Sequence, residues 1–170
     1  MAKSYGNFAH AYRGGSFNTA QERALNKIRP IVLQDVLVAD AAYTTTATAA
    51  DTLLSLTLAS GVWEIEGWLP VTSTANGGVK LNIALRDGMS VGAADQVKFY
   101  AFAAAALVTA GGVFGTTGIG TTTAVTSVKF EATITVTNPG SFVLTAAQNA
   151  SHSDTTTLLA GSRVRAMAVL

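Results

Sequence analysis

The stretch VKFEATITVTNPGSFVLTAA, residues 128–147, decides the fold class. Its first half places apolar side chains at every second position: Val128, Phe130, Ala132, Ile134 and Val136. A period of two is typical of a strand with one buried face, because successive side chains point to opposite sides. Asn138-Pro139-Gly140 then places Pro and Gly where a type II turn prefers them. The stretch therefore predicts a hairpin, whose return strand buries Phe142, Leu144 and Ala146.

The same alternation recurs on both sides of this stretch. It predicts further strands at residues 31–38, 54–58, 62–69, 79–86 and 164–170, with a short one at 158–159. Residues 97–108 are ambiguous, because their Ala content favours a helix while their aromatic residues favour a strand, and we predict a strand. Residues 111–120 are expected to form a loop. About eight strands with frequent turn signals and no intervening helix predict an all-β fold, a two-sheet antiparallel β-sandwich of jelly-roll type.

Residues 1–30 differ from this pattern and predict an extended N-terminal arm. The arm carries five basic residues against one acidic residue, a net charge of +4, whereas residues 31–170 carry six against nine, a net charge of −3. Thr19-Ala-Gln-Glu22 is a possible capping box, so a short helix is expected within the arm, ending before Pro30. We expect two units: a docking arm at 1–30 and a jelly-roll domain at 31–170.

The arm has spaced aromatic residues, which serve as anchors on a partner, and cations, which seek an acidic surface. We predict that it docks through Tyr5, Phe8, Tyr12, Arg13, Phe17, Arg23, Lys27 and Arg29. Nucleic acid is a competing partner for these charges. It is the less favoured one, because the rest of the chain has no basic stripe interleaved with aromatic residues.

The composition also indicates a protein that associates with other proteins. Charged residues make up only 12% of the chain, and its 23 Thr outnumber its 21 charged residues. Threonine suits pleated, half-buried strands, and a surface so poor in charge is typical of one covered by another protein. The chain has no Cys, so disulfides and thiolate metal sites are excluded. Residues 1–15 have no apolar run typical of a secretory signal, and residues 99–108 are too short to span a membrane.

No enzyme site can be assembled from the sequence, and we predict no catalytic, cofactor-binding or metal-binding residues. The two histidines, His10 and His152, lie far apart in the chain. Glu64 and Glu66 share one face of a strand and are expected to form a solvated or interface stripe. They do not flank a cleft as a glycosidase requires. The glycines of residues 115–120 lack the lysine of a phosphate-binding loop.

Three segments, residues 56–69, 128–151 and 158–167, together resemble the jelly-roll structural proteins of tailed bacteriophages. They are also similar to trimeric jelly rolls of the C1q/TNF type. In both groups a late strand ending in Gly-Ser-x-Val/Leu-x closes the sandwich. The resemblance implies a non-enzymatic virion protein. It transfers no site residues and does not distinguish a head protein from a tail protein.

The leading hypothesis is a capsid decoration, or cement, protein. It would form a homotrimer that stabilises the capsid from its outer surface. The arms would bind the major capsid protein, after synthesis in the host cytoplasm. Trimerisation is expected to cover small side chains such as those of residues 101–106. The alternative is a tail-fibre or receptor-binding knob that recognises its target through the loops at 87–96 and 111–123.

Overall fold

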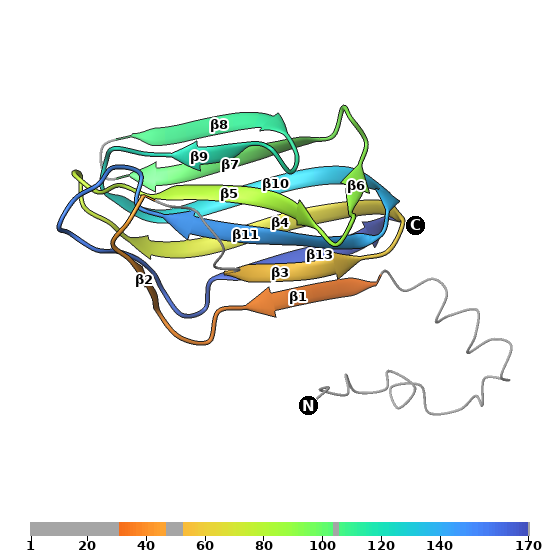
Figure 1. The fold of residues 1–170 in the computed structure, drawn as a ribbon, viewed down its shortest axis with the longest axis horizontal. Helices are drawn as coiled ribbons and strands as arrows, with labels where there is room; N and C mark the ends of the chain where they lie inside the picture. Colours follow the sequence, from red (N-terminus) through yellow and green to blue (C-terminus); the bar gives the residue numbers. More distant parts are fainter. Residues whose placement is uncertain (1–30, 47–52, 104–105, 170) are drawn as a thin grey trace, which may run out of the picture. The chain divides into compact units, whose positions relative to one another are not determined.

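A computed structural model of the chain describes residues 31–46, 53–103 and 106–169. Within these ranges the protein is all-β, and two antiparallel sheets face each other (Figure 1). The arm and its expected helix lie outside the described residues. The prediction of a two-sheet antiparallel β-sandwich for the region after Pro30 is confirmed.

The larger sheet has six long strands side by side. Their order is β1 (Val32–Val36), β13 (Arg163–Val169), β4 (Gly61–Thr72), β10 (Val125–Asn138), β7 (Gln96–Ala103) and β8 (Leu107–Val113). Three short strands extend it. β12 (Thr156–Leu158) pairs with the end of β4, β2 (Ala41–Tyr43) pairs with β12, and β6 (Ser90–Val91) pairs with β10. β4 and β10 are the longest strands and form the centre of this sheet.

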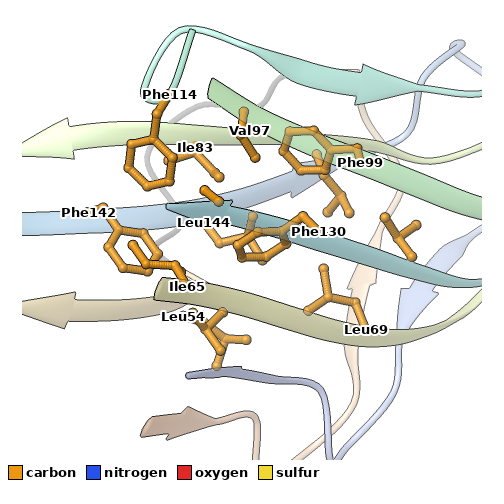
Figure 2. Packing of buried hydrophobic residues seen from close by; sticks show 14 of the residues in the cluster. Leu54, Ile65, Leu69, Ile83, Val97, Phe99, Phe114, Phe130, Phe142 and Leu144 are labelled. Carbon is orange, nitrogen blue, oxygen red and sulfur yellow. The ribbon is translucent and has the colours of Figure 1, made fainter. Parts of the chain in front are cut away.

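The smaller sheet has four strands, in the order β3 (Leu54–Leu58), β11 (Gly140–Ala147), β5 (Lys80–Arg86) and β9 (Gly118–Gly120). Their inward side chains meet those of the larger sheet in a single hydrophobic core (Figure 2). Four buried phenylalanines pack there in two pairs. The ring centroids of Phe99 and Phe130 are 5.6 Å apart, and those of Phe114 and Phe142 are 5.8 Å apart. Because β10 lies at the centre of its sheet, Phe130 lies near the middle of this core.

The hairpin predicted at Pro139 is wrong, although both of its strands exist. β10 belongs to the larger sheet and β11 to the smaller one, so the chain crosses between sheets at this corner. The type II turn is also wrong, because Gly140 is not among the glycines with positive φ. Gly140 is required for a different reason: a Cβ there would lie 2.7 Å from the backbone nitrogen of Met89.

Two other boundaries differ from expectation. Residues 97–108 contain parts of two strands, since β7 ends at Ala103 and β8 begins at Leu107. The loop expected at 111–120 is shorter than predicted, because β8 continues to Val113 and β9 spans Gly118–Gly120. The Gly-rich sequence concealed these strands, since glycine lowers strand propensity wherever it occurs.

Two glycines with positive φ allow a test of backbone constraint. Gly78 has a φ of 58°, and a Cβ there would overlap the carbonyl oxygen of Thr121. Gly161 has a φ of 88° with no atom near its Cβ position. Gly161→Ala therefore reports the conformational cost alone, about 1 kcal/mol. We expect Gly78→Ala to lower the free energy of unfolding by clearly more, as measured by urea denaturation; equal losses would show that the loop at Thr121 moves away.

Candidate functional site

The candidate site is the outer face of the larger sheet, where apolar side chains are exposed. Every large hydrophobic residue exposed within the described ranges lies on a strand of this sheet or next to β1: Ile31, Val32, Val36, Val38, Val62, Trp68, Phe102, Leu107, Val113 and Val169. The four strands of the smaller sheet expose none. A group of exposed apolar side chains on one face is typical of a surface that binds another molecule.

The strand register arranges this face in rows that run across all six long strands. The aromatic row contains Val36, Arg163, Trp68, Lys129, Tyr100 and Thr109. The charged row next to it contains Gln34, Arg165, Glu66, Glu131, Lys98 and Gly111. The third row contains Val32, Met167, Glu64, Thr133, Gln96 and Val113. The charged row therefore lies between the aromatic row and the third row, and each of these two rows has fewer charged residues.

One apolar end of the face is built around a pair of aromatic rings. Trp68 of β4 and Phe102 of β7 have ring centroids 6.2 Å apart and are 40% and 39% exposed. They reach each other across β10, where the small residue Ser127 pairs with Phe102 and is itself buried. Leu107 of β8 lies opposite Phe102 in the register and is 54% exposed. Trp68, Phe102 and Leu107 are called the apolar cluster below.

The charged row borders a shallow hollow of about 450 Å³. One ion pair lies in its lining, with Arg165 Nη1 3.5 Å from Glu66 Oε1. A second lies at its edge, where Lys129 Nζ is 3.2 Å from Glu131 Oε2. The described part of the chain gives no ion-pair partner to Glu64, Lys98 or Arg163, which lie on the same face. These three charges are available to groups on another molecule.

Glu131 is held by groups from two strands. The Tyr100 hydroxyl donates a hydrogen bond of 2.9 Å to Glu131 Oε1, and this bond is the main reason that the pKa of Glu131 lies below its ordinary value. The hydrogen bond from Lys129 lowers the same pKa further. The bond to the carboxylate also raises the pKa of the Tyr100 hydroxyl above its ordinary value. The pair fixes both side chains on the face without burying either.

A single substitution tests this arrangement. In Tyr100→Phe the carboxylate loses its strongest stabilising contact, so the pKa of Glu131 should rise towards its ordinary value. The wild-type contribution to stability is present above the unfolded-state pKa of Glu131 and is lost as the pH falls through its lower folded-state pKa. Carboxyl NMR titration of both proteins measures the change. An unchanged Glu131 titration would show that the hydrogen bond is absent in solution.

The structure places the sequence-predicted residues as follows. Glu64 and Glu66 lie on one exposed face, as predicted. Ala101, expected on a contact surface, is instead buried in the core, because the face of β7 that looks outward carries Phe102. His152 lies in a polar turn, where its Nδ1 accepts a hydrogen bond from the backbone of Asp154.

The docking residues of the arm, and His10 with them, lie outside the described residues: Tyr5, Phe8, Tyr12, Arg13, Phe17, Arg23, Lys27 and Arg29. The apolar cluster was missed at the sequence level. Part of its signal was present, because Trp68 continues the outward series of Glu64 and Glu66 by steps of two. Phe102 and Leu107 gave no comparable signal, since their strand boundary was unclear.

Among the residues that the structure describes, no group of three potential metal-ligating side chains occurs. The described ranges contain no helix long and apolar enough to cross a bilayer. The exposed rings and unpaired charges can contribute contact area and ion pairs to a partner surface.

Comparisons with known proteins give distant similarities only. No family model and no curated protein sequence matches the chain. A chain in the tripod from the baseplate of bacteriophage Tuc2009 aligns over 100% of this chain and 79% of its own length, with 9% identity and a TM-score of 0.38. A chain of the infectious bursal disease virus VP2 subviral particle aligns over 84% of this chain and 42% of its own length, with 15% identity and a TM-score of 0.21.

A third chain, from infectious bursal disease virus Gx strain, aligns over 82% of this chain and 40% of its own length, with 16% identity and a TM-score of 0.22. All three structures are of phage or viral particles or parts of them. TM-scores of this size do not establish a common fold.

Proposed function

We propose that this protein is a non-enzymatic structural component of a bacteriophage particle, and specifically a capsid decoration protein. In this proposal the sandwich forms a homotrimeric knob on the outer capsid surface, and the basic arms at 1–30 bind the major capsid protein. The observation that carries it is the outer face of the larger sheet, where the exposed large apolar side chains of the described strands lie. Such a face needs protein to cover it.

The strand order supports a jelly roll as the fold of the knob. Eight strands form what is called the eight-strand frame below; in chain order they are β1, β3, β4, β5, β9, β10, β11 and β13. The first, eighth, third and sixth of these are neighbours in the larger sheet, and the second, seventh, fourth and fifth are neighbours in the smaller sheet. Two sheets that share eight strands in this order form the jelly roll of many capsid proteins. The strand order thus agrees with the sequence resemblance to phage jelly-roll proteins.

The charge distribution supports docking through the arm. The arm has a net charge of +4, and the remainder of the chain has a net charge of −3. Three arms on one trimeric knob would raise the affinity for a shell through effective concentration, by roughly 10²–10⁴ over a single arm. A weak contact for each arm is therefore sufficient for stable decoration.

Copy number in purified particles tests the location. Quantitative mass spectrometry should find this chain in numbers comparable to those of the major capsid protein. A handful of copies for each particle would overturn decoration and favour the tail-fibre or receptor-binding knob. Absence of the chain from particles would overturn the whole proposal.

A further inference from the structure

The β7–β8 hairpin stands outside the eight-strand frame. It follows β5 and β6 in the chain and is added to the larger sheet beyond β10 (Figure 1). Its outward side chains include Phe102, Leu107 and Val113, all exposed. The hairpin therefore widens the outer face and supplies two of the three residues of the apolar cluster.

We propose that the apolar cluster is the anchor on which a second copy of this chain packs, and that the charges beside it set the register of the contact. The inference deepens the proposed function and rests on its self-associating knob. It assigns the contact to Trp68, Phe102 and Leu107. Tryptophan is among the residues most enriched at the energetic centres of protein interfaces.

The size of the face suits a second copy. The six long strands, with three outward positions on β1 and at least four on each of the others, cover about 700 Å² at the normal strand and residue spacings. A stable specific interface buries about 800 Å² on each partner. A second copy of this chain offers surface of this extent, so it can cover the whole face.

The charges on the face also favour a copy over a partner of one sign. Four basic residues (Lys98, Lys129, Arg163 and Arg165) are interleaved with three acidic residues (Glu64, Glu66 and Glu131). Nucleic acid or a strongly acidic protein would meet the three carboxylates and be repelled by them. A second copy presents both signs and can pair with Glu64, Lys98 and Arg163, the charges left unpaired within the described chain.

The test uses the full chain at micromolar concentrations in sedimentation equilibrium. We expect the wild type to be oligomeric and Leu107→Glu to weaken association at least tenfold, because a carboxylate would be buried in the anchor. Thr57→Glu on the smaller sheet is the matched control, since it adds the same charge at an exposed strand position. Trp68→Ala is a second variant that adds no charge and should also weaken association at least tenfold. Circular dichroism checks that all the variants remain folded.

Each outcome is decisive. Weaker association of both cluster variants, with an unchanged control, supports the anchor. An oligomer that persists in Leu107→Glu and Trp68→Ala overturns the anchor and leaves the knob intact. If the oligomer persists but both variants bind to capsids more weakly, the face contacts another particle protein instead of a second copy. A monomeric wild type overturns both the anchor and the homotrimeric knob, whereas the copy number in particles is measured independently.

Discussion

Phe130→Ala is expected to lower the free energy of unfolding by about 3–5 kcal/mol, the range for removing a phenylalanine from a core. The ring is fully buried on the central strand β10 and packs against Phe99 (Figure 2). It also lies against Gly67 of β4. Its removal would leave a cavity between two rigid sheets that cannot collapse. Urea denaturation at one fixed protein concentration measures the loss. Thr155→Ala, at an exposed position, is the control and should change stability by less than about 0.5 kcal/mol.

The contact between Phe130 and Gly67 allows a second test of the same packing. A Cβ at Gly67 would overlap the Phe130 ring, so Gly67→Ala should be strongly destabilising on its own. In the double variant the alanine methyl at 67 would occupy part of the space that the ring leaves. The two losses should therefore be less than additive. Additive losses would show that residue 67 and the ring do not contact each other in solution.

The sequence predicted the elements of the fold better than their pairing. The alternation of Phe130, Ile134, Phe142 and Leu144 fixes which side chains point inward, and all four are buried. It cannot say which sheet a strand joins, because an inward face looks the same from either sheet. Asn138-Pro139-Gly140 therefore suggested a hairpin where the structure has a corner between sheets. Pairing depends on contacts distant in the chain, such as that of β10 with β4.

The candidate site was predictable only in part. The outward series through Glu64 and Glu66 indicated an exposed face on that strand, and the structure agrees. The sequence did not reveal the apolar cluster, because Trp68 and Phe102 come from strands separated by β10 and meet only through the register. The small side chain of Ser127 between them has no meaning until that register is known. The sequence therefore indicated the arm as the binding site, because its aromatic and basic residues can be recognised without knowing the fold.

The second large effect concerns that arm. A chain lacking residues 2–29 should bind to capsids stripped of this protein at least 100-fold more weakly than the full chain, because all the arms of a multivalent knob are lost together. Its unfolding transition and its number of copies per oligomer should stay unchanged, since the sandwich and its outer face begin at Ile31. Binding is measured by co-sedimentation with the stripped capsids, and mass by sedimentation equilibrium.

Two substitution sets separate the contributions of charge and aromatic contacts within the arm. Neutralising Arg13, Arg23, Lys27 and Arg29 to Gln should weaken binding and reduce its salt dependence, because exposed charges are screened as ionic strength rises. Replacing Tyr5, Phe8, Tyr12 and Phe17 by Ala should weaken binding while the salt dependence remains. Full-strength binding by the shortened chain would place the docking contact on the sandwich itself, and the outer face of the larger sheet would then be its first candidate.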